Sequence, residues 1–487
     1  MQRRLAAVLL VCSVLLAGCS GTLTPPTAGG EPKKGPLLGE GWSYPDDPPE
    51  DRLGWEAGYW HNESVDVDQS DGLNASERRA LVARTMARVE RVRGLEFRKT
   101  VPVQVVSREE YRNNSPFGGG RSAAYEAWRN QVWEAALLVG EERNTSDVFA
   151  ELYGGSVLGY YSPSGDRIVV ISESATPRID RATLAHELVH ALQDQHFDVP
   201  GARTRDAAWA HQGVTEGDAR YVESLYERRC AGGDGASENV TSGDDANATW
   251  NCVPRPESGA GGGGNPANRG VFLTIYVPYS DGPALVEDVR ERGGWDAVNR
   301  MYANPPASTE QVIHPEAYPD ERPVEVTVSD RSGEGWSRFD LRGQRATETM
   351  GEVTLFAMQY HNGLVERDLR TGGTPLSPYN YSDPASAGWA GDRLVPYRNA
   401  DGENGYVYRI TFDTERDARE FERAYRTLLT LQLGGEQVRE AGGPGLVYRI
   451  PEDRAYGDAF RVYRDGDTVT IVNAPAVEEL SEVHDPQ

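Results

Sequence analysis

Lysine is almost absent from this chain of 487 residues, occurring only at Lys33, Lys34 and Lys99, and arginine supplies the other basic side chains. The 50 basic residues stand against 75 acidic ones, which gives a formal net charge of −25. Nucleic-acid phosphates require a basic surface, and anionic lipid headgroups attract basic segments. The charge balance therefore argues against nucleic acid as a partner and against binding to an anionic membrane surface.

Cysteine is also scarce, with only four residues in the chain. Cys12 and Cys19 lie close to the N-terminus, so the remainder of the chain contains only Cys230 and Cys252. A structural zinc site built from cysteines needs more ligands than these two. In an oxidising compartment the two cysteines are predicted to form a disulfide, which stabilises a chain by about 3 kcal/mol for a loop of this length.

Long apolar runs are missing beyond the first twenty residues. Arg3 and Arg4 precede the apolar stretch 5–17, which is too short to span a bilayer and is typical of a cleaved export signal. Leu16-Ala17-Gly18-Cys19 resembles a lipobox, which implies a mature protein held at the cell surface by a lipid on Cys19. Secretion without a lipid is the alternative, and the arginine pair leaves a twin-arginine export route open.

The excess of acid together with the depletion of lysine resembles proteins of salt-loving archaea, where high ionic strength screens the self-repulsion. An acidic secreted protein from a bacterium with GC-rich DNA is the alternative interpretation.

The amino-acid composition changes along the chain and predicts four consecutive segments. Residues 1–19 form the signal, and residues 20–50, which are rich in Gly, Pro and Thr, form a flexible tether. The rest is too long for one small core, and we expect a first domain over 51–323 and an α+β lobe over 324–487. Residues 230–270 are expected to form an insertion in the first domain, with the disulfide and a Gly-rich loop.

One stretch carries a metal-binding pattern, since His186-Glu187-Leu188-Val189-His190 reads His-Glu-x-x-His. Apolar residues recur around it at helical spacing, so His186 and His190 are expected one turn apart on the same face of a helix. Both imidazoles can then reach one Zn²⁺, while Glu187 can take a proton from a water molecule. The alternative is a chance match of two surface histidines.

Two residues compete for the third zinc ligand. His196 has the offset used by metzincins, but the position where those enzymes break the helix is Gln193, which favours helix. His196 is therefore expected to be structural or to support a ligand. Glu216 lies on a second amphipathic helix and would leave zinc an open position for water. Its alternative role is that of an ordinary solvated acid on a helix surface.

These residues resemble a known family. The motif from His186 to Asp198, followed by Glu216-Gly217-Asp218-Ala219, is similar to secreted, gluzincin-like zinc metalloproteases whose haloarchaeal members are surface lipoproteins. Similarity continues at 306–315 and 388–393. The resemblance implies a zincin-like fold, bound zinc and a peptide or protein substrate. Asp218 is a candidate for holding a ligand histidine by a hydrogen bond. Against it, thermolysin-like enzymes place that carboxylate four residues after the glutamate, where this chain has Arg220.

Further elements follow from turn signals and periodicity. Tyr160-Tyr161 and 167–172 flank a Ser-Pro-Ser-Gly turn and are predicted to be paired strands, whose edge could hold an extended peptide. The apolar spacing from Asn74 to Arg93 predicts a helix closed by Gly94, and a helix over 283–292 is expected to end at Gly293-Gly294. In the second lobe, a strand, a helix and two strands between 406 and 472 resemble a ferredoxin-like module.

His314 is the candidate for stabilising an oxyanion, with Tyr279 as the second choice and a structural role as the alternative. The sequence thus predicts a cell-surface zinc metallopeptidase in which His186, His190 and Glu216 hold Zn²⁺ and Glu187 acts as general base. Two alternatives remain: a zincin-fold protein without activity that acts in binding or envelope structure, and a protein that acts only through its C-terminal lobe.

Overall fold

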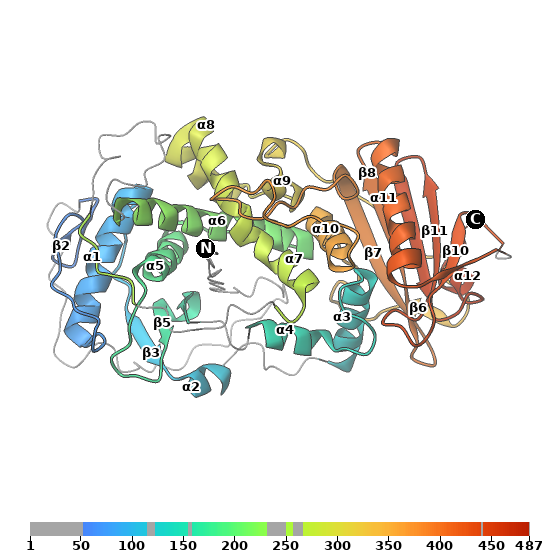
Figure 1. Ribbon diagram of the computed structural model, residues 1–487, viewed down its shortest axis with the longest axis horizontal. Helices are drawn as coiled ribbons and strands as arrows, with labels where there is room; N and C mark the ends of the chain where they lie inside the picture. The colour runs from blue at the N-terminus through green and yellow to red at the C-terminus, as the bar shows by residue number, and fades with distance from the viewer. Residues whose placement is uncertain are drawn as a thin grey trace, which may run out of the picture.

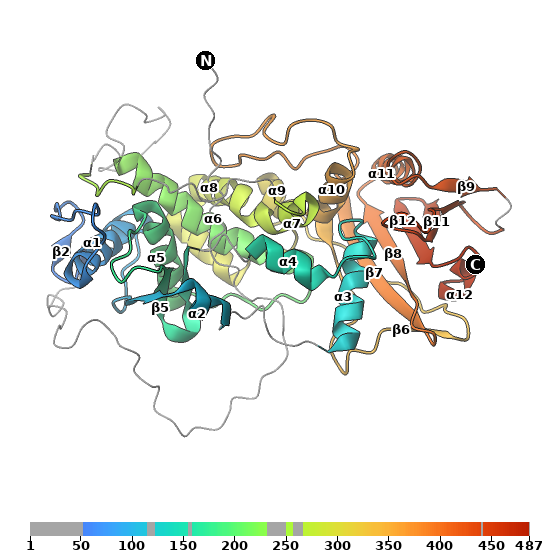
Figure 2. The same ribbon diagram turned by 60° about the horizontal axis from the view of Figure 1, so that its bottom comes forward.

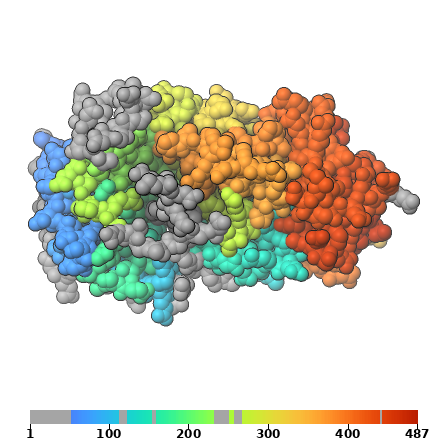
Figure 3. Space-filling view, in the orientation of Figure 1, coloured from blue at the N-terminus to red at the C-terminus, as the bar shows by residue number. Residues whose placement is uncertain are grey.

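The computed structural model describes residues 52–113, 122–153, 158–230, 250–256, 266–439 and 442–486. The predicted signal, the tether and the Gly-rich loop therefore lie outside the described residues. The architecture is mixed α+β, as predicted, with most helices at one end of the molecule and a large sheet at the other (Figure 1). In the space-filling view the early and late parts of the chain occupy opposite ends of the long axis (Figure 3). Among the described residues, no helix combines the length and apolar character required to cross a membrane.

The first long helix, α1 (Ala75–Arg93), forms where the sequence predicts it. Asn74 caps its N-terminus by accepting backbone N–H bonds from Ser76 and Glu77, and the Glu77 side chain accepts the Asn74 N–H in return. Gly94 ends the helix with φ 74°, a conformation that glycine adopts at little cost. The short strands β1 (Trp55–Glu56) and β2 (Tyr59–Trp60) pair with each other and pack on α1.

A three-stranded sheet lies beside α5. Its order is β3 (Val103–Val106), β5 (Arg167–Ile171), β4 (Gly159–Ser162), and the predicted hairpin is confirmed as the antiparallel pair β4–β5. Strand β4 is at the edge of the sheet. Three helices connect β3 to β4: α2 (Arg108–Asn113), α3 (Ala123–Ala135) and α4 (Thr145–Tyr153).

Two long helices form the centre of the helical part. Helix α5 (Arg181–His196) begins at Asp180, whose carboxylate accepts two backbone N–H bonds, and it runs without a break to His196. Helix α6 (Arg205–Cys230) packs against α5 and also against α7 (Arg269–Ser280) and α8 (Gly282–Ala303) (Figure 2). Cys230, the last residue of α6, forms a disulfide with Cys252, as the sequence predicts.

Helix α8 confirms the predicted helix end. Gly293 and Gly294 leave helical geometry and form a kink, and a second helical segment follows them and continues to Ala303. The second segment buries Val298, Met301 and Tyr302, and this packing stabilises it.

The C-terminal lobe is built on a seven-stranded antiparallel sheet of order β6-β7-β8-β12-β11-β10-β9. Its strands are β6 (Trp336–Arg338), β7 (Trp389–Asn399), β8 (Asn404–Phe412), β9 (Glu436–Val438), β10 (Leu446–Arg449), β11 (Ala459–Asp465) and β12 (Thr468–Ala474). The short helix α9 (Glu310–Ile313) precedes the lobe, whose described α-helices are α10 (Gly351–His361), α11 (Glu415–Thr427) and α12 (Leu480–Val483). The sheet is wider than the predicted ferredoxin-like module, because β6, β7, β9 and β11 add to the strands expected from the sequence.

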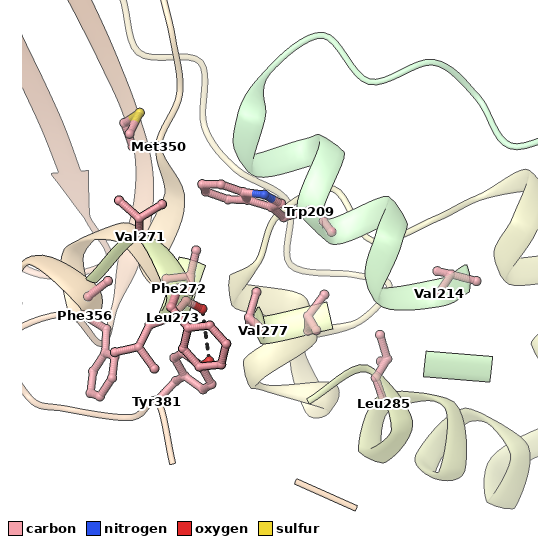
Figure 4. Packing of buried hydrophobic residues seen from close by; sticks show 14 of the residues in the cluster. Trp209, Val214, Val271, Phe272, Leu273, Val277, Leu285, Met350, Phe356 and Tyr381 are labelled. Carbon is pink, nitrogen blue, oxygen red and sulfur yellow. Dashed lines mark hydrogen bonds between the residues drawn. The ribbon is translucent and has the colours of Figure 1, made fainter. Parts of the chain in front are cut away.

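One hydrophobic core extends through both halves of the chain. It runs from Leu73 near α1 to Ile471 in β12, and Figure 4 shows a part of it where α6, α7 and α10 meet. In this part the Tyr381 hydroxyl donates a hydrogen bond of 3.0 Å to the Leu273 carbonyl of α7. A smaller cluster around Val395 covers the other face of the large sheet. The predicted domain division at 323/324 therefore does not coincide with a break in the main core.

Candidate metal centre

Helix α5 presents the two motif histidines to a single point. His186 and His190 are one turn apart, with ring centroids separated by 4.8 Å and ring planes nearly perpendicular at 85°. Their Nε2 atoms lie 3.1 Å apart, and both side chains are buried. The helix therefore aims two nitrogen ligands at the same space, as the motif predicts.

Helix α6 adds the oxygen atom of a third group. The Oε2 atom of Glu216 lies 3.3 Å from His186 Nε2 and 3.2 Å from His190 Nε2. The three atoms thus form a nearly equilateral triangle, and these residues form one of the groups whose ligand atoms all lie within 4.8 Å of one another. Zinc bonds of about 2.0–2.1 Å in a tetrahedron separate neighbouring ligand atoms by about 3.3–3.4 Å. The triangle fits a zinc ion that keeps a fourth position open.

The opposite nitrogen of each histidine faces an oxygen acceptor. His190 Nδ1 lies 3.0 Å from the amide oxygen of Gln193, whose own N–H donates to the Thr215 carbonyl. His186 Nδ1 lies 3.2 Å from Oε2 of Glu223 on α6, within ion-pair distance but without the alignment of a hydrogen bond. The Gln193 oxygen assigns the proton of a neutral His190 to Nδ1, and the Glu223 carboxylate favours the same tautomer of His186, which leaves each Nε2 a lone pair for the triangle.

The charges around the triangle favour a cation. Burial lowers the pKa of His186, but Glu216, Glu223 and Glu187 outweigh it and raise that pKa to about 10. Burial raises the pKa of Glu216, but the two histidines outweigh it and hold that pKa at about 2. The buried carboxylate therefore requires positive charge beside it, which imidazole protons or a metal ion can supply.

Glu187 lies next to the triangle but is not one of its three residues. It follows His186 by one residue, so its side chain leaves α5 in another direction, and its Oε2 accepts a 2.7 Å hydrogen bond from the Tyr161 backbone N–H of β4. It is close enough to raise the pKa of both His186 and His190. A carboxylate in this place can accept a proton from a water molecule at the triangle.

The other candidates from the motif region have structural contacts. His196 stays on α5 and its Nε2 donates to the Glu96 carbonyl at 2.6 Å, away from the ligand face. Asp218 does not hold a ligand histidine. Its carboxylate accepts hydrogen bonds from Arg93 Nε at 2.9 Å and from the Tyr302 hydroxyl at 2.6 Å. The candidate role of Asp218 in holding a ligand histidine is therefore wrong, because Arg93 and Tyr302 occupy its carboxylate.

His314 is not among the residues that converge on the triangle. Its Nε2 lies 3.2 Å from Oε2 of Glu352 on α10, and Glu316 lies 3.9 Å from its Nδ1. These carboxylates raise the pKa of His314 against the effect of burial. Tyr279, the second choice, is buried on α7 beside Tyr276. A role for either residue in stabilising an oxyanion stays a prediction.

Two residues of the centre were not predicted from the sequence, Gln193 and Glu223. Gln193 is three residues after His190, and Glu223 is seven residues after Glu216, which places it two turns along the same face of α6. The spacing of seven is the signal that could have identified Glu223. From the sequence alone, other acids on α6 could equally be expected to face His186. The way in which α5 crosses α6 decides which of them does.

The comparisons with known proteins address another part of the chain. Residues 337–484 match the model of a family described as a domain of unknown function, DUF8575. No curated protein matches the chain, and no solved structure matches it. The match covers the C-terminal lobe and leaves the triangle of His186, His190 and Glu216 outside it, so the chemistry of the centre is argued from its own geometry.

Proposed function

We propose that this protein is a zinc-dependent metallopeptidase of the gluzincin type that acts at the cell surface. The observation that carries the proposal is the triangle of His186 Nε2, His190 Nε2 and Glu216 Oε2, with sides of 3.1–3.3 Å and with Glu187 beside it. Two histidines and one glutamate from two helices are a ligand set of catalytic rather than structural zinc sites, which normally have four protein ligands.

The residues have separate roles in this proposal. Zinc, when bound, lowers the pKa of a water molecule and polarises the carbonyl group of a substrate. His186, His190 and Glu216 hold the ion, and the negative charge of Glu216 offsets part of its charge. Glu187 accepts the proton of the attacking water and then delivers it to the leaving amine, a transfer that contributes roughly 10²–10⁴-fold to such reactions.

Strand β4 is the candidate binding edge for a peptide. The Ile171 N–H donates to the Leu158 carbonyl, so the N–H and C=O groups of Gly159 and Tyr161 point away from β5. The Tyr161 N–H reaches Glu187 in this direction, which brings the edge next to the general base. Among the described strands, β4 has no neighbour on this side, and an extended substrate can pair with it through backbone hydrogen bonds.

The location of the enzyme is part of the proposal. The export signal and the lipobox-like Leu16-Ala17-Gly18-Cys19 support a mature chain anchored to the membrane through a lipid on Cys19. The disulfide between Cys230 and Cys252 agrees with an oxidising exterior.

The test uses the purified ectodomain in high salt, with zinc content measured by elemental analysis and cleavage measured on casein and a peptide mixture. We expect one zinc per chain in both the wild type and Glu187→Gln, and cleavage by the wild type alone. Glu227→Gln is the control, because Glu227 lies on α6 and pairs with Arg181 rather than with a histidine. Absence of zinc from the wild type would overturn the proposal.

The second candidate is a zinc-binding protein of the same fold without peptidase activity. It is favoured by the burial of the centre, since His186, Glu187, His190 and Glu216 are at most 3% exposed. A substrate therefore needs an opening of the surface to reach the metal. Stoichiometric zinc in the wild type, without cleavage of any substrate in a broad peptide library, would support this candidate.

A further inference from the structure

The ligand histidine His186 faces an acid that lies seven residues after Glu216, not four residues after it as in thermolysin-like enzymes. The position four residues after Glu216 is Arg220, a side chain with donors but no acceptor, so it cannot hold the Nδ1–H of a histidine. Glu223, one turn further along α6, approaches His186 instead, with 3.2 Å between its Oε2 and His186 Nδ1.

Arg220 and Glu223 act as a unit. Arg220 Nη1 donates to both carboxylate oxygens of Glu223, at 3.0 Å and 2.8 Å. The Glu223 side chain is 13% exposed and the Arg220 side chain 31%, while that of His186 is 1% exposed. Arg220 thus lies nearest to the surface, Glu223 lies deeper, and His186 is fully buried. Arg220 holds the carboxylate of Glu223 in the position where it faces the imidazole of His186.

The two ligand histidines are supported differently. Gln193 offers His190 a neutral amide oxygen, whereas Glu223 offers His186 a carboxylate. A carboxylate that accepts the Nδ1–H increases the electron density at Nε2 and holds the ring in place, and loss of such a partner typically weakens metal binding about 10–100-fold. Glu223 is therefore expected to contribute more to metal affinity through His186 than Gln193 contributes through His190.

We infer that Glu223, held by Arg220, is the positioning residue that fixes His186 with its Nε2 toward the metal. This inference rests on the proposed function, because it assigns Glu223 a role at the same zinc site. It replaces the suggestion that Asp218 performs this task, since Asp218 is engaged by Arg93 and Tyr302. The inference concerns orientation and metal affinity, and Glu223 itself does not need to contact a substrate.

The test measures the zinc dissociation constant of the ectodomain by competition with a chromophoric chelator. Glu223→Gln keeps an oxygen acceptor but loses the charge, and we expect about 10-fold weaker binding; Glu223→Ala loses both, and we expect about 100-fold. Arg220→Gln is expected to weaken binding by less than Glu223→Gln does. Glu227→Gln, on the same helix one turn away, is the matched control and should bind as the wild type does.

A second readout separates positioning from general stability. Cobalt is bound in place of zinc, and the visible absorption of the ion reports the geometry of its ligands. We expect a shifted spectrum for Glu223→Gln and an unchanged one for Glu227→Gln. If Glu223→Ala fails to fold, Glu223→Gln alone decides the question.

The possible failures can be told apart. A wild type that binds no zinc overturns the proposed function and this inference with it. A wild type with tight zinc, together with Glu223→Gln that matches Glu227→Gln in affinity and in cobalt spectrum, overturns the inference and leaves the zinc site intact.

Discussion

The Nε2 atoms of His186 and His190 lie 3.1 Å apart, and Glu216 Oε2 stands at nearly the same distance from both. Three lone-pair-bearing atoms at such short range repel one another unless positive charge lies among them. Whether a proton or a metal ion supplies this positive charge therefore affects how strongly α5 and α6 are held together.

Removal of the metal should destabilise the protein. A ligand that binds only the folded state at 1,000 times its dissociation constant adds about 4 kcal/mol to the free energy of unfolding. We expect a strong chelator to lower the melting temperature of the wild type, with recovery on addition of zinc. Glu216→Gln should respond much less, whereas Glu227→Gln should respond as the wild type does. Equal responses of all three proteins would place the stabilising metal elsewhere.

Gly217 tests the packing behind the ligand Glu216. A Cβ atom at this position would lie 2.5 Å from the carbonyl carbon and oxygen of Gly282 at the start of α8, and a backbone cannot turn aside as a flexible side chain can. Gly217→Ala should therefore shift α6, reduce the free energy of unfolding by about 1–3 kcal/mol and weaken zinc binding. Gly201→Ala is the control, because no atom lies within 4 Å of the added carbon. Unchanged zinc affinity would show that α6 tolerates the shift.

The pair of Arg93 and Asp218 is expected to serve stability alone. Both side chains are almost fully buried, and removal of one partner from a buried ion pair costs about 3–5 kcal/mol. Asp218→Asn should lower the melting temperature strongly while the folded fraction keeps its zinc. Asp288→Asn, at an exposed pair with Arg292, should change stability by less than about 1 kcal/mol. Loss of zinc from folded Asp218→Asn would indicate that Asp218, and not Glu223 alone, supports the metal site.

The contact between α3 and the C-terminal lobe should depend on pH. Burial and the neighbouring Glu141 raise the pKa of Asp458 to about 7, and burial and Asp458 raise the pKa of Glu134 on α3. The raised pKa means that the folded state holds a proton that the unfolded state releases near pH 4. The stability that this proton provides is complete below about pH 4 and is lost as the pH rises through about 7.

Asp458→Asn should remove the part of this dependence that comes from Asp458, whereas the buried Glu134 keeps its own raised pKa. Between pH 4 and 7 the free energy of unfolding of the wild type should fall relative to that of the variant, by up to about 1.4 kcal/mol per pH unit for one proton. Denaturant unfolding in high salt at several pH values measures the difference. Asp296→Asn, at an exposed position, is the control and should keep the slope of the wild type. Parallel slopes for all three proteins would contradict the prediction.

Local signals predicted the elements that carry the centre. The Asn74 cap, the apolar period around His186 and the turn before β5 each determine structure through neighbouring residues, so these elements appear where the sequence indicates. Glu216 could be predicted because its helix follows the motif helix and carries apolar residues at regular spacing. The disulfide followed from a count of the available cysteines.

Contacts between distant segments were not predictable in the same way. The two glycines end the predicted helix, but the second segment of α8, stabilised by buried side chains after Gly294, was not predicted. Glu223 and Asp218 are both acids on α6, and the angle at which α5 crosses α6 decides that one faces His186 and the other faces Arg93. The extra strands of the large sheet depend on pairing partners far away in the chain, which periodicity within one strand does not reveal.

The matched segment 337–484 contains α10, and the whole run from Gly351 to Gln359 is buried where α10 packs on α7. Expressed alone, this segment would expose that apolar surface to water and would be prone to aggregate. A unit of this chain that folds by itself is therefore larger than the matched segment, since it includes the surface of α7 that receives α10.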